Sequence, residues 1–216
     1  MPVMADRSPV LRIITSAARD SLKPLGLAQR GRSRVWIDDH GWWLGVVEFT
    51  PLRTAGSSLH VGAMWLWHDV DYLAFHAGSG RTGHEIFRTE GQFTPLALAL
   101  GRQAAAETTA LRERFPDLPA VARHLTSRPA QRGFLWDSFD AGIAAALVGA
   151  TDTARGLFER VLREDALAPW MVEAQEKTRE LHAIAADQDA VTGWVTRAVD
   201  SCRSKLALGP LQLAIS

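Results

Sequence analysis

The fold of this chain is decided by an apolar stretch at residues 59–68, which reads Leu59-His60-Val61-Gly62-Ala63-Met64-Trp65-Leu66-Trp67-His68. Every second residue from Leu59 to Trp67 is apolar, and this period of two is the pattern of a β-strand with one face in the core. The alternate set contains histidines and a glycine, so we expect the other face to be mixed. The stretch therefore predicts a strand inside a sheet.

The same period of two extends over residues 33–88, which hold five of the eight tryptophans: Trp36, Trp42, Trp43, Trp65 and Trp67. Residues 35–38 and 42–49 flank Asp39-His40-Gly41, whose residue types tolerate a tight turn and predict a hairpin. Residues 72–76 and 84–87 are shorter candidate strands on either side of a glycine-rich turn. Since the connections are too short for parallel crossovers, we expect an antiparallel meander of four or five strands.

Helical patterns lie on both sides of this segment. Ser8-Pro9 predicts a helix over residues 9–22 with Ser8 as its cap. Thr94-Pro95 predicts the start of a long helix that ends near Arg114. Shorter helices are expected at about 119–126, 139–148, 153–163, 168–186 and 190–207. The chain is thus predicted to be α+β, with an N-terminal helix and a Trp-rich antiparallel sheet followed by an all-helical second half.

A linker signal at residues 127–133, Ser127-Arg128-Pro129-Ala130-Gln131-Arg132-Gly133, predicts two regions. Residues 1–127 would form the α+β domain, and residues 134–216 a helical region packed on it. Within the second region, the spacing of Gly149, Ala154 and Phe158 resembles the second half of a tetratricopeptide repeat. A repeat stack needs about three copies, and the sequence shows one partial copy, so we interpret it as an ordinary helical hairpin.

Composition narrows the class of protein. Lys+Arg and Asp+Glu are balanced at 24 each, so no global field draws the chain to nucleic acid or to an anionic membrane. No apolar run approaches the ~18 residues of a membrane span, and the single cysteine, Cys202, excludes an intramolecular disulfide and a multi-cysteine zinc site. We expect a cytoplasmic protein without a membrane segment, and the abundance of Arg and Ala is typical of GC-rich bacterial genomes.

One motif resembles a cofactor site. Residues Gly78-Ser79-Gly80-Arg81-Thr82-Gly83 match G-x-G-x-x-G, the dinucleotide-binding fingerprint. That fingerprint requires a helix after the glycines within a strand-helix-strand unit, whereas the residues that follow extend only to Gly91. We therefore predict a hairpin turn here and no bound cofactor.

Potential metal ligands gather in the predicted sheet. His60 and His68 would lie on one face of the same strand, with Asp69 and His76 nearby. Imidazole and carboxylate groups are the ligands of hydrolytic zinc, iron and manganese sites. The sequence contains no H-E-x-x-H or other close-spaced ligand pair. A metal-dependent hydrolase with a divalent ion at this sheet edge is therefore an alternative and not the leading hypothesis.

A basic stripe, Arg30, Arg32 and Arg34, precedes the sheet. Beside exposed aromatic residues such as Trp43 and Trp67, it would suit single-stranded nucleic acid, in which arginines neutralise phosphates and aromatics stack bases. The alternative is a solvated strand edge that charge protects from aggregation, and the neutral total charge favours it. These five residues are the predicted binding surface, with another protein as the expected partner and nucleic acid as the weaker alternative.

The landmarks of the first half resemble a known family. Leu22-Lys23-Pro24-Leu25-Gly26-Leu27, then Arg30-Gly31-Arg32, then Trp42-Trp43-Leu44 and the stretch from Val61 to Trp67 are similar to the bacterial domain-of-unknown-function family 4304 over about residues 8–115. The resemblance implies an α+β module with protein-binding roles, including neutralisation of toxins, and it transfers no site residue. The sequence also has no G-x-S-x-G motif, and no histidine is adjacent to Cys202 in the sequence. We therefore favour a non-enzymatic protein-binding or immunity-type module.

Overall fold

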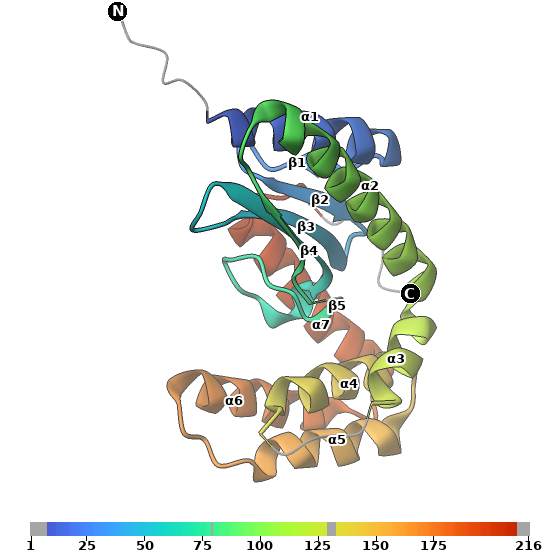
Figure 1. Cartoon of the computed structure of the whole chain (residues 1–216). Coiled ribbons are helices and arrows are strands. Elements are labelled where there is room, and N and C mark those ends of the chain that lie inside the picture. The colour runs from blue at the N-terminus through green and yellow to red at the C-terminus, as the bar shows by residue number, and fades with distance from the viewer. Residues whose placement is uncertain (1–7, 79, 129–132, 211–216) are drawn as a thin grey trace, which may run out of the picture. The chain divides into compact units, whose positions relative to one another are not determined.

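The predicted strand at residues 59–68 lies inside an antiparallel sheet as β4 (Gly56–Trp65), between β3 on one side and β5 and β6 on the other (Figure 1). The computed structural model describes residues 8–78, 80–128 and 133–210. A helix and the sheet come first, and the second half is helical. The predicted α+β fold class is therefore confirmed.

The described residues form two compact units, each treated by itself below. The first contains the chain up to Glu113 together with residues 205–207, and the second contains the remainder. This division precedes the predicted boundary at residues 127–133, because α3 (Leu118–Thr126) packs with α4 (Leu135–Leu147) inside the second unit. Residues 129–132 of the predicted linker lie outside the described residues.

The first helix has the predicted bounds, α1 (Pro9–Leu22), with Pro9 at its first position. Its apolar residues recur at helical spacing and are buried: Val10, Ile13, Ile14, Ala17, Ala18 and Leu22. Ser8 differs from expectation, since its side chain makes no capping hydrogen bond. A short 3-10 turn, η1 (Lys23–Leu25), follows and ends at Gly26, whose φ of 87° favours glycine.

Six strands form the sheet: β1 (Ala28–Gln29), β2 (Val35–Asp39), β3 (Trp43–Pro51), β4, β5 (Ala77–Gly78) and β6 (Thr82–Ile86). The strands β1 to β4 pair with their neighbours in chain order, all antiparallel. The expected hairpin joins β2 to β3, and the Asp39 carboxylate accepts a hydrogen bond of 2.9 Å from the Gly41 amide.

The glycine-rich segment is not the predicted hairpin turn. Both β5 and β6 pair antiparallel with β4, at Gly62↔Gly78 and Ser58↔His84, so they continue one another along the same edge. The close approach of the chains explains the glycines, since a Cβ on Gly78 would lie 2.6 Å from the Cα of Gly62. A strand follows the glycines, and the helix that a dinucleotide site requires is absent from this position.

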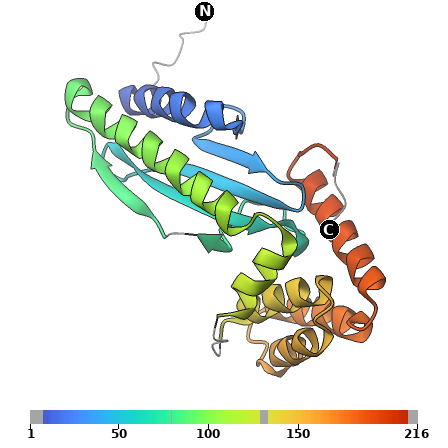
Figure 2. The same cartoon turned by 90° about the vertical axis from the view of Figure 1, so that its right-hand side faces the viewer.

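Both faces of β4 are buried. Helices α1 and α2 (Glu90–Arg114) lie over one side of the sheet (Figure 2). Ala63, and with it Leu59 and Val61, faces this side, because Ala63 pairs with Gly45 and Gly45 pairs with Asp38, whose carboxylate contacts Arg112 of α2. On the other side Phe75 stacks on His60, with ring centroids 3.6 Å apart, and the Ala74 amide donates to the Met64 sulfur at 3.4 Å. The segment that connects β4 to β5 therefore covers the face of β4 that was predicted to be mixed.

Helix α2 begins four residues before the predicted start at Thr94. The Thr89 hydroxyl accepts a hydrogen bond of 3.2 Å from the Gln92 amide, and the Gln92 side chain accepts one of 3.1 Å from the Arg88 amide. This exchange is similar to a capping box, and it places Pro95 inside the helix. Further along, Gly101 lets the helix approach α1, since a Cβ there would lie 2.8 Å from the Ala17 carbonyl oxygen.

A buried ion pair connects α2 to the sheet. The Arg112 guanidinium donates to both oxygens of the Asp38 carboxylate at 2.8 and 2.7 Å, and to the Leu25 carbonyl at 2.8 Å. His40, stacked on Trp43, contacts the same carboxylate at 2.8 Å. Burial alone would raise the pKa of Asp38, but the hydrogen bonds and positive charges of Arg112 and His40 lower it to about 2 from 3.8.

Acid should therefore destabilise the first unit through Asp38. A carboxyl group whose pKa is lower in the folded state stabilises the protein above its unfolded pKa, and this contribution, on the order of 2 kcal/mol, is lost as the pH falls from about 4 to about 2. We expect Asp38→Asn to be less stable than wild type at pH 7 and to show a smaller loss between pH 4 and pH 2. Urea unfolding at each pH measures both, and parallel curves for the two proteins would contradict the assignment.

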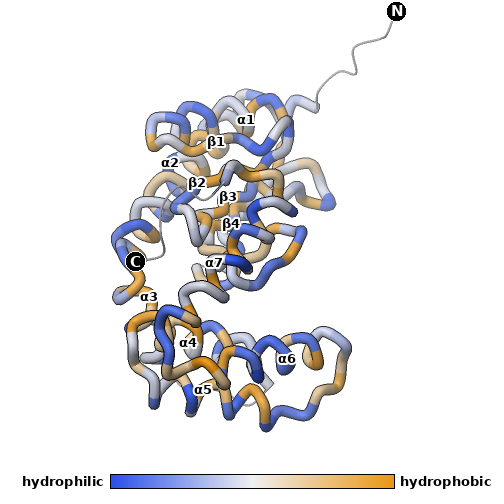
Figure 3. The backbone as a smooth tube through the Cα atoms, turned by 180° about the vertical axis from the view of Figure 1, so that it is seen from behind, coloured by the Kyte–Doolittle hydropathy of each residue, from blue (hydrophilic) through white to orange (hydrophobic). Residues whose placement is uncertain are grey.

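The second unit consists of α3, α4, α5 (Thr151–Arg163), α6 (Pro169–Ile184) and most of α7 (Gln188–Lys205). Asp117 caps α3 by accepting a 2.7 Å hydrogen bond from the Ala120 amide. Helix α4 is apolar over its second half and α5 alternates apolar and polar residues (Figure 3). The predicted hairpin joins them, and its close contact is Gly142 against the Phe158 ring, where a Cβ would lie 2.5 Å from a ring carbon.

The helices of the described chain include none with the length and apolar content that crossing a membrane requires.

Candidate functional site

The four predicted metal ligands separate into one pair and two single residues. The rings of His68 and His76 are stacked with centroids 4.0 Å apart, and nitrogens of the two rings lie within 4.8 Å of each other. His60 instead stacks on Phe75, and the Asp69 carboxylate forms an ion pair of 2.8 Å with Lys205. Burial, assisted by the charge of Arg81, lowers the pKa of His60.

The hydrogen bonding of His76 opposes metal binding. Its Nδ1 accepts a 2.9 Å hydrogen bond from the Trp65 backbone amide. A neutral imidazole with an accepting Nδ1 carries its proton on Nε2, and a protonated nitrogen cannot coordinate a metal. Binding through Nε2 would therefore break the bond to Trp65. The metal site thus remains a prediction, and the geometry around His76 argues against it.

Metal analysis tests this point directly. We expect untagged, dialysed protein to contain much less than one transition-metal ion per chain, and a His68→Ala variant to contain the same amount, because His76 is committed to Trp65. Plasma mass spectrometry measures the metal content. About one ion per chain that disappears in the variant would establish the sheet-edge site.

The five residues of the predicted binding surface differ in their exposure. Arg30 and Arg32 are exposed, but Arg34 is half-buried and burial lowers the pKa of its guanidinium. Trp43 is 3% exposed and Trp67 is 0% exposed, so neither presents its ring to solvent. Trp67 stacks on Trp42 and Trp65, at centroid distances of 5.6 and 5.4 Å. The tryptophans of the sheet are core residues, and the arginine stripe has no exposed sheet tryptophan beside it.

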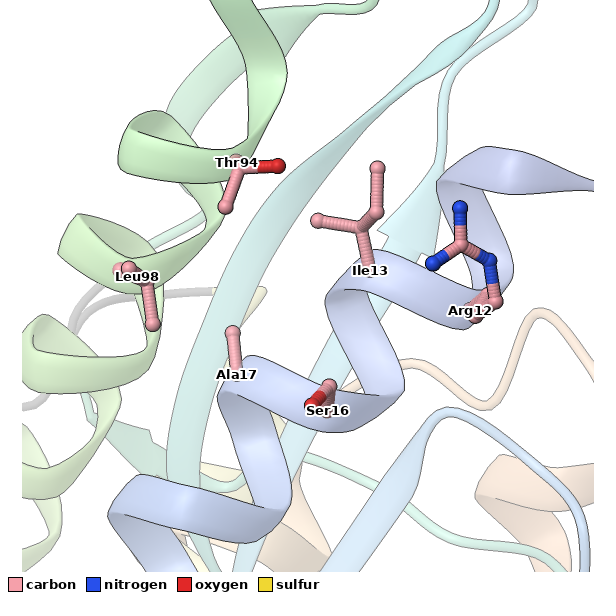
Figure 4. A pocket seen from close by; sticks show the side chains of 6 residues that line it. All are labelled: Arg12, Ile13, Ser16, Ala17, Thr94 and Leu98. Carbon is pink, nitrogen blue, oxygen red and sulfur yellow. The ribbon is translucent and has the colours of Figure 1, made fainter. Parts of the chain in front are cut away.

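A small pocket opens between α1 and α2 in the first unit. Its volume is about 210 Å³, and its lining residues are Arg12, Ile13, Ser16, Ala17, Thr94 and Leu98 (Figure 4). The charge of Arg12 is paired with Glu90 at 2.6 Å. Two hydroxyl groups and an apolar floor supply no nucleophile with an adjacent base, so this pocket has no catalytic chemistry of its own.

The second unit exposes a different group of apolar residues. Phe134 is 56% exposed and Leu167 is 88% exposed, and Trp170 is 45% exposed at the start of α6. Half-buried Trp136 stacks on Trp170 with centroids 5.5 Å apart and an angle of 21° between the rings. We call these four side chains the tryptophan patch: the two tryptophans are in contact, and Phe134 and Leu167 lie within three residues of them in the sequence. They come from the starts of α4 and α6 and from the loop before α6.

Contacts within the second unit hold the tryptophan patch in place. Trp136 packs edge-on against Phe139, which is completely buried, with centroids 5.4 Å apart. The Gly133 amide donates a 3.1 Å hydrogen bond to the Glu164 carboxylate, which ties the start of α4 to the loop before α6. The patch therefore rests on core packing as well as on loop conformation.

Buried Gln175 fixes that loop, and sequence reasoning did not identify it. Its side-chain amide donates to the carbonyl groups of Val161 at 3.1 Å and Glu164 at 2.7 Å, at the end of α5. Carbonyl groups at a helix end have no partner within the helix, so Gln175 supplies one from α6. The bonds fix the direction in which the chain leaves α5 toward Leu167.

Comparisons of the chain with protein-family models, with curated proteins and with solved structures give no match. The resemblance to family 4304 therefore stays a prediction. The functional argument rests on the residues of the chain itself.

Replacement of Gln175 tests how the loop is held. We expect Gln175→Met to lower the free energy of unfolding by about 1–3 kcal/mol, because the Glu164 carbonyl loses the Gln175 donor and the Val161 carbonyl keeps only the Glu164 amide. Urea unfolding of the full chain measures the change. The exposed neighbour Glu176→Met is the control, with an expected change below about 0.5 kcal/mol. Equal stabilities for the two variants would contradict the capping role.

Proposed function

We propose that this chain is a non-enzymatic protein-binding module of the immunity type, which binds another protein through the tryptophan patch. The single observation that carries the proposal is the exposure of Leu167 and of Trp170, on which half-buried Trp136 stacks. Tryptophan is over-represented among the residues that contribute most to protein–protein binding.

Three features support the proposal. Exposed and adjacent apolar residues lower solubility, so their presence on a surface indicates an interaction site. The stack of Trp136 on Trp170, backed by buried Phe139, pre-orders the rings, and less side-chain entropy is then lost on binding. The resemblance to family 4304 implies protein-binding roles, including toxin neutralisation, and we propose that the module acts in the cytoplasm.

Catalysis is the weaker hypothesis. The only cysteine, Cys202, is completely buried in α7, where a substrate cannot reach its sulfur. His76 is committed to the Trp65 amide, and the Asp69 carboxylate to Lys205. The titratable residues proposed for a hydrolase thus have structural partners in the first unit.

The proposal is tested by comparing partner binding between surface variants of the full chain. We expect Leu167→Ser and Trp170→Ser each to weaken binding of the captured partner by about tenfold or more, since removal of a central anchor commonly costs 2 kcal/mol or more, about thirtyfold. Affinity purification followed by a binding titration of the captured protein measures the loss. Leu167 is 88% exposed, so its replacement should leave folding unchanged.

The matched control is Val172→Ser. Val172 is 44% exposed on α6, close to the 45% of Trp170, but two residues along a helix place it on a different side. This variant should bind as wild type does. Loss of binding in Val172→Ser alone, or unchanged binding in both patch variants, would contradict the proposed site. Substrate turnover by the purified protein would contradict the non-enzymatic proposal.

A further inference from the structure

We propose that the tryptophan patch binds a basic segment of the partner protein, in which lysine or arginine residues flank an apolar anchor. This inference rests on the proposed function, because it names the chemistry of the partner at the same site.

Apart from Arg132, two residues before Phe134, the charged residues nearest to the patch in the sequence are acidic. Residues 133–137 and 164–173, which carry the patch, contain four carboxylates and no lysine or arginine: Asp137, Glu164, Asp165 and Glu173. We call these four residues the acidic rim. Asp165 and Glu173 are exposed, and Asp137 and Glu164 are half-buried. The nearest preceding arginine on α5, Arg163, is already paired with Glu159 at 2.7 Å.

The positions of the rim place its charges beside the rings. Glu173 follows Trp170 by three residues on α6, and residues at this spacing lie on the same side of a helix. Asp165 lies two residues before Leu167, and Glu164 is held by the Gly133 amide at the start of α4. A ligand seated on the rings would therefore contact or closely approach carboxylates.

Helix stability explains only one member of the rim. Asp137 lies in the first turn of α4, where the helix dipole stabilises a carboxylate. Glu164 and Asp165 lie between α5 and α6, and Glu173 is in the second turn of α6, beyond the strongest part of that effect. Exposed Asp165 and Glu173 are available to attract a cation, whereas half-buried Glu164 already accepts the Gly133 hydrogen bond.

The tryptophan rings favour the same partner. The face of an indole ring attracts lysine and arginine side chains by a cation–π interaction, and tryptophan is the strongest of the aromatic residues in this respect. A basic segment would thus gain from both the rings and the carboxylates. Its apolar anchor would cover Leu167 and Phe134, the two most exposed members of the patch.

The rim disfavours the other classes of ligand. Nucleic acids carry phosphates and anionic membranes carry negative headgroups, and both would be repelled by the carboxylates. A second copy of this chain, joined by a two-fold axis at the patch, would place acidic rim against acidic rim, because such an interface pairs like surfaces. Charge complementarity therefore favours a basic segment of another protein as the ligand.

Two peptides of equal length test the inference with the full chain. They share one Leu- and Phe-containing apolar centre, which four lysines flank in one peptide and four glutamates in the other. We expect the lysine peptide to bind at least about tenfold more tightly, and this preference to shrink at high salt as charge screening increases. Fluorescence anisotropy of labelled peptides at low and high salt measures the affinities.

Charge reversal within the rim supplies the matched comparison. Asp165→Lys combined with Glu173→Lys should abolish or invert the preference for the lysine peptide, and both positions are exposed, so folding should be retained. The control variant reverses two exposed carboxylates outside the rim, Glu113→Lys and Asp200→Lys, and should keep the preference.

Equal binding of the two peptides, preference for the glutamate peptide, or no binding of either would overturn the inference. Self-association of the chain that Leu167→Ser abolishes would identify a second copy as the ligand and would also overturn it. These outcomes would not by themselves contradict the proposed function. If capture of a partner depends on Leu167 but the lysine peptide shows no advantage, the binding site stands and only the partner chemistry is wrong.

Discussion

Burial of both faces of β4 is the constraint on which the first unit depends. Helices α1 and α2 lie over one face, and the segment that carries Phe75 covers the other (Figure 2). Trp42, Trp65 and Trp67 stack on one another within this core, at exposures of 8% or less. Because the aromatic residues of the sheet stabilise its packing, they are not available to a partner. The exposed aromatic residues of the described chain lie outside the sheet: Tyr72 in the segment that follows the 3-10 turn η2 (Leu66–His68), and Phe134 and Trp170 in the second unit.

In the second unit, the tryptophans of the patch are not fully buried. Burial of apolar surface stabilises a protein by about 25 cal/mol per Å². A tryptophan that stays partly exposed therefore contributes less to the stability than a fully buried one would. Trp136 and Trp170 both remain partly exposed, although Phe139, which packs against Trp136, is completely buried. Gln175 and the Gly133–Glu164 hydrogen bond then hold the loop beside them. Ordered support beneath exposed rings is the arrangement expected of a surface selected for binding, since a preformed site loses less entropy when it is occupied.

The sequence predicted the parts of the fold that periodicity controls. Alternation identified β4, Pro9 identified the start of α1, and Asp39-His40-Gly41 identified the hairpin. The predictions were wrong where tertiary contacts determine the local structure. Thr89 with Gln92 provided a stronger helix start than Thr94 with Pro95, and close packing of Gly78 on Gly62 replaced the expected turn. His60 and His68 were expected on one face, but β4 ends at Trp65 and the 3-10 turn η2 (Leu66–His68) redirects His68. The tryptophan patch was missed because an apolar residue at a helix start gives the same signal whether it is buried or exposed.

Total charge alone does not identify a partner, because attraction depends on the charges near the site. Lysines and arginines balance aspartates and glutamates at 24 each, which correctly removes any long-range field but conceals local segregation. Exposed Arg30 and Arg32 belong to the first unit, whereas the acidic rim belongs to the second. At physiological salt the screening length is about 8 Å, so only charges within about that distance of the rings act strongly on a bound segment. Under the proposed function, a chain without net charge would select a basic partner through the few carboxylates that accompany one stacked pair of rings.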